Sequence, residues 1–170
     1  MSIGYRDMPN VLVYDSEITL APDELAYFPL HDMMLENPAA YLRREFMYLY
    51  RYDLTSVRLT ARTETHPHFV EASQSPTIVA TSDDQYAIGL YTPDIPRNGF
   101  PDAEQRKFLG YVFTDWGTVV SLSARIRAVP ASGAIFEPGT YRYRTFLAIG
   151  RVSDVAASLQ RLVSAGLSDR

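Results

Sequence analysis

Apolar and polar residues alternate with a period of two along much of the chain. Between residues 118 and 128 the even positions from 120 on are apolar, and the odd positions from 121 on carry two serines and two arginines. Successive side chains of a β-strand point to opposite faces of the sheet. The pattern therefore predicts a strand over 118–128, with an apolar face and a polar face.

The segment 54–69 shows the same alternation. Apolar residues occupy the odd positions 57–61, whereas the even positions from Arg58 to His68 are all polar. A shift of the strand register by one residue would bury the charged side chains, and the cost in free energy would far exceed any gain from the alternative pairing. We therefore predict one long strand whose odd positions point into the core and whose even positions face solvent or a cleft.

The centre of the chain predicts a β-hairpin. Two β-prone runs, 77–82 and 85–91, flank the polar pair Asp83-Asp84. Two strands joined by a short polar turn are typical of a hairpin. Aspartate adopts a positive φ less readily than glycine, so a turn longer than two residues is favoured. Two further strands are predicted over 108–116 and 140–149.

Two segments have helical patterns. Beyond Ser153, which we interpret as an N-cap, apolar residues at 155, 159, 162 and 163 share one helical face, and Gly166 marks the end. Asn37-Pro38 also resembles a helix start. We expect a short helix over 38–43 that runs into a strand.

These elements predict a mainly β protein. Many strands, few helices and frequent turns favour an antiparallel β-sandwich with a C-terminal helix. A length of 170 residues, without repeats or linkers, indicates a single domain over 1–170.

Composition narrows the possible functions. The chain has no cysteine, which excludes a disulfide scaffold, a cysteine nucleophile and metal sites built on thiolates. A net charge of −4 argues against a general nucleic-acid binder. No apolar run is long enough to span a membrane, and the N-terminus lacks the apolar core of a signal peptide. We therefore expect a cytoplasmic protein that binds neither nucleic acid nor membrane.

Two segments resemble a known family. The hairpin over 82–93 ends in Gly-Leu-Tyr-Thr-Pro, and the segment 136–150 combines a Pro-Gly turn with a tyrosine-rich strand and a glycine before the helix. Both are similar to the C-terminal half of bacterial, carbohydrate-associated proteins of the galactose-mutarotase-like supersandwich fold. The resemblance implies a β-sandwich with a polar face that meets carbohydrate. It implies no catalytic residue, because the sequence contexts of the mutarotase acid and base are missing.

The strongest candidate site lies within 64–71. On a continuous strand, Glu64, His66 and His68 project from one face. Such a set is compatible with a metal site, with an acid–base pair, with a sugar contact or with a solvated polar face. Because Pro67 disturbs the strand and no fourth ligand follows, we predict no bound metal and no cofactor.

Three more residues are candidates for ligand contact. Arg62 and Arg125 lie on polar faces, where guanidinium groups suit carboxylated or phosphorylated ligands but also form solvated cross-strand pairs. Trp116, at the end of a predicted strand, offers a broad apolar face for a sugar ring or for core packing. The tyrosines at 48–52 and 141–143 are interpreted as sheet packing.

We predict a carbohydrate-binding or carbohydrate-associated module without an identifiable catalytic set. One alternative is a sugar epimerase or lyase that uses Glu64, His66 and His68. Another is a structural module that forms homo-oligomers through an open sheet edge.

Overall fold

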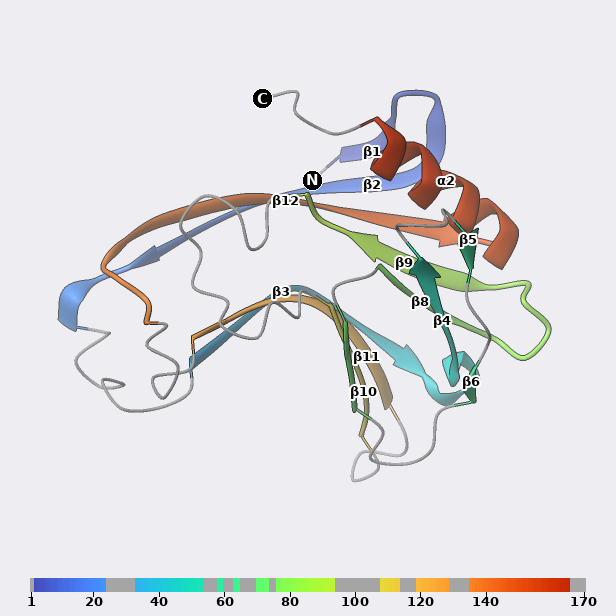
Figure 1. The fold of residues 1–170 in the computed structure, drawn as a ribbon, viewed down its shortest axis with the longest axis horizontal. Coiled ribbons are helices and arrows are strands. Elements are labelled where there is room, and N and C mark those ends of the chain that lie inside the picture. Colours follow the sequence, from blue (N-terminus) through green and yellow to red (C-terminus); the bar gives the residue numbers. More distant parts are fainter. Residues whose placement is uncertain are drawn as a thin grey trace.

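Figure 1 shows the computed structural model of the chain, which describes residues 2–23, 33–53, 58–59, 63–64, 70–73, 76–93, 108–113, 119–128 and 135–165. The helical elements with described bounds are the short 3₁₀-helix η1 (Arg44–Phe46) and the α-helix α2 (Val152–Ser164). The strands are β1 (Ser2–Tyr5), β2 (Met8–Leu20), β3 (Met33–Arg43), β4 (Tyr48–Asp53), β5 (Arg58–Leu59), β6 (Thr63–Glu64), β7 (Val70–Ser73), β8 (Thr77–Ala80), β9 (Ala87–Tyr91), β10 (Phe108–Phe113), β11 (Val119–Ala128) and β12 (Gly139–Gly150).

The described strands form two antiparallel sheets. The larger sheet has the order β1-β2-β12-β9-β8-β4-β5, with β6 also paired to β4. The smaller sheet has the order β3-β11-β10-β7. The mainly β class, the antiparallel pairing and the C-terminal helix are thus confirmed. No helix in the described part of the chain is long and apolar enough to cross a membrane.

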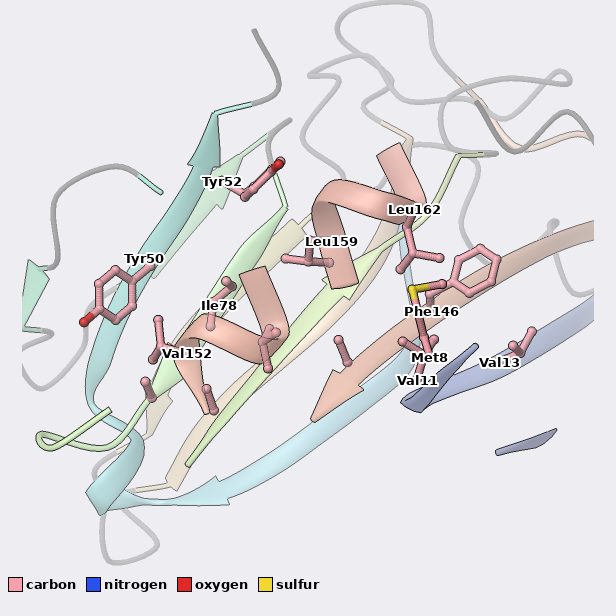
Figure 2. Close-up of a cluster of buried hydrophobic side chains, with 14 residues drawn as sticks. Met8, Val11, Val13, Tyr50, Tyr52, Ile78, Phe146, Val152, Leu159 and Leu162 are labelled. Carbon is pink, nitrogen blue, oxygen red and sulfur yellow. The ribbon is translucent and has the colours of Figure 1, made fainter. Parts of the chain in front are cut away.

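Both faces of the larger sheet are covered at its centre. Figure 2 shows the cluster on one face, where Leu159 and Leu162 of α2 pack with Ile78 and Phe146 of the sheet. A second cluster joins the two sheets through Leu49, Val79 and Leu90 of the larger sheet and through Val120 and Leu122 of the smaller one. Successive residues Ile78 and Val79 therefore enter different clusters, which explains why the run 78–80 is apolar without alternation.

The hairpin prediction is confirmed, and so is its long turn. Strands β8 and β9 pair directly, with Ala80 opposite Ala87. Six residues, 81–86, connect these strands. Asp84 has a φ of 60° within this turn.

The strand prediction over 118–128 is also confirmed, as β11, although part of its polar face is buried and not exposed to solvent. Ser121 and Ser123 are as buried as Val120 and Leu122. β11 lies between β3 and β10 inside the smaller sheet. Larger neighbours on both sides can shield a small serine side chain from water.

The predicted helix over 38–43 is wrong, because this segment belongs to β3. Residues 39–43 pair in register with β11, Ala40 lying opposite Leu122. Ser123 lies opposite Ala39 and Arg125 opposite Glu36, so β3 contains one extra residue at Asn37-Pro38. A bulge in an edge strand tolerates proline, which has no N–H to donate. Pairing with a distant strand outweighs the local helix signal.

The described pairs within the single strand predicted over 54–69 do not share one register. Leu59 of β5 lies opposite Tyr52, and Glu64 of β6 lies opposite Tyr48. An uninterrupted ladder would place Thr63 opposite Tyr48, so the register shifts by one residue between the two short strands. A strict alternation therefore does not run through residues 58–64, and the remainder of 54–69 lies outside the described residues.

The C-terminal helix begins earlier than its sequence signal. Arg151, not Ser153, occupies the N-cap position, and no side chain caps the helix there. Instead, the backbone N–H of Val152 donates a hydrogen bond of 3.1 Å to the carbonyl oxygen of Asp84. The cap prediction was wrong because the acceptor comes from the β8–β9 turn. Gly166, predicted as the helix stop, lies outside the described residues.

The outer halves of β2 and β12 form a ribbon with a polar ladder on one face. Directly opposite residues pair as Thr19 with Thr140, Glu17 with Arg142, and Asp15 with Arg144. Arg144 contacts both carboxylate oxygens of Asp15, at 2.6 and 2.9 Å. Exposed pairs of this kind stabilise a sheet by only about 0–1 kcal/mol each.

Candidate functional site

The residues predicted as a site are only partly described. Arg62, His66, His68 and Trp116 lie outside the described residues. The backbone of Glu64 belongs to β6 in the larger sheet, and that of Arg125 belongs to β11 in the smaller sheet. The side chains of these two residues lie outside the described part.

Metal binding has no support from the described residues. No three or more histidine, aspartate or glutamate side chains come together among them in a way that could hold a metal ion. The side chains of the predicted candidates Glu64, His66 and His68 lie outside the described part of the chain.

A groove lies where the chain crosses from the smaller to the larger sheet. Its lining comes from residues 43–48, which include η1 and link β3 to β4, and from Thr81, Ser82, Asp83 and Tyr86 of the β8–β9 turn. The groove has a volume of about 660 Å³. Ligand sites for small molecules commonly have volumes of about 300–1,000 Å³. Its size therefore suits a ligand of one to a few sugar rings.

The turn that lines the groove is held by its own hydrogen bonds. The Thr81 hydroxyl donates to Asp83 Oδ1 at 2.6 Å, and the Gln85 N–H donates to the same oxygen at 3.1 Å. The N–H of Tyr86 donates to Thr81 Oγ1 at 3.2 Å. The Thr81 hydroxyl, followed by the Gln85 N–H, lowers the pKa of the Asp83 carboxyl. Asp83 is therefore a fixed, ionised hydrogen-bond acceptor at neutral pH.

The same turn is also tied to the core of the protein. The Tyr50 hydroxyl of β4 donates a hydrogen bond of 2.7 Å to Asp84 Oδ1. The backbone carbonyl of Asp84 accepts the hydrogen bond from Val152 at the start of α2. Contacts to a strand and to a helix fix the turn in place, so this wall of the groove is formed before any ligand binds.

Charged groups of both signs line the groove. Arg43 forms an ion pair of 3.5 Å with Glu45. Neither Arg44 nor Asp83 forms an ion pair with a described residue. Within the described part of the chain, the groove is thus lined by one guanidinium and one carboxylate that form no ion pair.

Aromatic residues add an apolar surface. Tyr86 lies in the turn and is 66% exposed, while Phe46 and Tyr48, which also line the groove, are half-buried. An aromatic ring with an exposed face can pack against the apolar C–H face of a sugar ring. Of the tyrosines interpreted as sheet packing, Tyr50, Tyr52 and Tyr143 are indeed buried, whereas Tyr48 lines the groove.

Most residues that line the groove carry no signal of ligand binding in the sequence. Tyr86 was part of the hairpin motif, but Arg43, Arg44 and Asp83 were not singled out as ligand contacts. The sequence offered no signal for Tyr86, because its pattern placed this residue in the β-prone run 85–91, whereas β9 begins only at Ala87. Of the two predicted residues whose backbone is described, Glu64 lies opposite Tyr48, which lines the groove, and Arg125 lies opposite Glu36, which does not.

Comparisons with models of protein families, with curated proteins and with solved structures found no match for this chain.

Proposed function

We propose that this protein is a carbohydrate-binding module and that the groove between residues 43–48 and the turn 81–86 is its binding site. The observation that carries the proposal is the exposed ring of Tyr86 beside the fixed carboxylate of Asp83. A sugar presents an apolar C–H face and a rim of hydroxyl groups. The ring of Tyr86 can pack against the C–H face, and the carboxylate of Asp83 can accept hydrogen bonds from the hydroxyl groups.

The hydrogen bonding of Asp83 supports this assignment. Oδ1 already accepts two hydrogen bonds from the turn. A carboxylate offers about four lone-pair sites, so Oδ2 remains able to accept hydroxyl protons from a ligand. Because the turn holds the carboxylate in place, little side-chain entropy is lost when a ligand binds.

Binding fits the described groove better than acid–base catalysis does. Its described lining contains no histidine, and its only carboxylates are Glu45, paired with Arg43, and Asp83. A lowered pKa makes Asp83 a poor proton donor and a weak base at neutral pH. The epimerase or lyase hypothesis thus gains no support from this site.

Oligomerisation through a sheet edge is also less favoured. The edge strand β3 is interrupted by the bulge at Asn37-Pro38, and the pairing of β1 with β2 shifts between Ile3 and Tyr5. Bulges and prolines are features that disfavour edge-to-edge pairing. Neither of these two edges offers a long, regular ladder to a second chain.

The test is binding of the purified protein to an array of neutral and acidic oligosaccharides, followed by calorimetry on the strongest ligands. Tyr86→Ala should weaken binding about tenfold or more, which corresponds to about 1.4 kcal/mol. Tyr41→Ala is the matched control, because Tyr41 is 62% exposed but does not line the groove. It should leave affinity unchanged.

Absence of binding to every oligosaccharide on the array would contradict the proposal. Equal losses of affinity in Tyr86→Ala and Tyr41→Ala would show that the groove is not the site. Thermal melts of both variants should match the wild type, since surface substitutions usually change stability by less than about 0.5 kcal/mol.

A further inference from the structure

We infer that the ligand of the groove is an acidic sugar, whose carboxylate binds the guanidinium of Arg44. This inference rests on the proposed carbohydrate-binding function and names the class of sugar. It comes from the charges that line the groove, which are two arginines and two acidic residues.

These four charges are not equivalent. Arg43 and Glu45 form an ion pair with each other, so their charges largely cancel. Asp83 is engaged by neutral donors, the Thr81 hydroxyl and the Gln85 N–H. Arg44 has no ion-pair partner among the described residues, and arginine stays protonated at any physiological pH. Among the described residues, Arg44 is therefore a cationic donor without an ion-pair partner, and Asp83 is an anionic acceptor in the same groove.

A hydroxylated carboxylate complements this pair of groups. The planar guanidinium fork matches the two oxygens of a carboxylate, which gives a charge-assisted and bidentate contact. The hydroxyl groups of the same sugar can donate to Asp83. A neutral sugar could also donate hydrogen bonds to Asp83, but it would leave the guanidinium of Arg44 without a charged partner.

A single negative charge fits better than a phosphate. One uncompensated guanidinium balances one negative charge, whereas a phosphate monoester carries about −1.5 to −2 at neutral pH. The ionised carboxylate of Asp83 in the same groove disfavours the additional charge. A uronic acid is therefore favoured over a sugar phosphate.

The experiment compares matched oligosaccharides. Each uronic-acid oligosaccharide is measured beside the same molecule with its carboxylates reduced to primary alcohols, and beside its 6-phosphate. Several ring stereochemistries are included, and dissociation constants are measured by calorimetry. We expect the uronic form to bind about tenfold more tightly than the reduced form at low salt. The difference should shrink in 0.5 M NaCl, because salt screens exposed charges.

Variants assign the effect to Arg44. Arg44→Gln should bring the affinity for the uronic form down to that for the reduced form and leave the reduced form unchanged. Arg142→Gln is the matched control, since Arg142 is an exposed arginine on the β2–β12 ribbon and does not line the groove. It should preserve the preference for the uronic form.

The outcomes separate the two proposals. If reduced and uronic forms bind equally and Tyr86→Ala weakens both, carbohydrate binding holds and the acidic-sugar inference is overturned. A preference for the 6-phosphate also overturns it. If no oligosaccharide binds, both proposals fail.

Discussion

The hydroxyl of Tyr50 and the carboxylate of Asp84 join the core of the protein to the wall of the groove. Tyr50 is 8% exposed and packs in the cluster beneath α2, and its hydroxyl lies 2.7 Å from Asp84 Oδ1. The carbonyl of Asp84 also accepts the first hydrogen bond of the helix. One turn residue thus links a strand, a helix and the candidate site.

Removal of the Tyr50 hydroxyl should destabilise the protein. Tyr50→Phe keeps the ring in the core but deletes a hydrogen bond to a charged, partly buried acceptor. We expect the free energy of unfolding to fall by about 1–2 kcal/mol, measured by urea denaturation. Tyr86→Phe is the control, because its ring is exposed, and its unfolding free energy should equal that of the wild type. Equal stability of all three proteins would contradict a structural role for this hydrogen bond.

Gly89 allows α2 to approach the sheet closely. A Cβ atom at this position would lie 2.7 Å from Val155 Cγ1 and 3.1 Å from Leu159 Cδ1. Both contacts are too short, so Gly89→Ala forces the helix or its side chains to move. Overpacking of this kind costs about 1–3 kcal/mol, which a fall in the thermal midpoint would report.

A double variant tests this cause. Val155→Ala removes the atom nearest to the added Cβ, although it is destabilising by itself because Val155 is fully buried. The double variant should therefore lose less stability than the sum of the two single variants. A strictly additive loss would mean that the contact between the added Cβ and Val155 does not cause the loss of stability in Gly89→Ala.

The turn between β1 and β2 carries backbone strain. Arg6 and Asp7 have φ angles of 43° and 61°, a conformation that favours glycine. Asp7→Gly should therefore raise the unfolding free energy, by up to about 1 kcal/mol. Asp154→Gly is the control, because Asp154 lies in the first turn of α2, where glycine should lower stability. A loss of stability in Asp7→Gly would contradict the prediction.

Alkaline pH should destabilise the protein through Tyr143. Burial raises the pKa of Tyr143 to about 12, although a hydrogen bond with Ser16 acts in the opposite direction. Tyrosine in an unfolded chain has a pKa of about 10. Between these values the unfolded chain loses its proton while the folded protein keeps it, so the unfolding free energy falls as pH rises.

The Tyr143→Phe variant isolates this contribution. Its stability should decline less steeply than that of the wild type from about pH 10 to pH 12, in urea titrations at a series of pH values. Below pH 10 the two proteins should differ by a constant amount. Parallel curves over the whole range would show that Tyr143 does not titrate in the unfolding equilibrium.

Elements with a short-range signal could be predicted from the amino-acid sequence alone. The alternation over 118–128 predicted β11, and the apolar stripe from 155 to 163 predicted the buried face of α2. The hairpin 77–91 followed from a polar turn between two β-prone runs. For β11 and α2 the apolar side chains recur with the period of a single element, and for the hairpin the turn lies between its two strands, so no knowledge of distant neighbours was needed.

Features that depend on distant partners could not be predicted without the fold. Residues 38–43 became a strand because β11 supplies hydrogen bonds to them, and α2 begins at Val152 because the carbonyl of Asp84 accepts its first N–H. The groove likewise joins residues 43–48 to the turn 81–86, which are more than thirty positions apart in the chain. Local propensities are worth fractions of a kcal/mol per residue, and pairing and packing between distant segments outweigh them. The candidate site is therefore a property of the assembled sheets, which no single segment of the sequence contains.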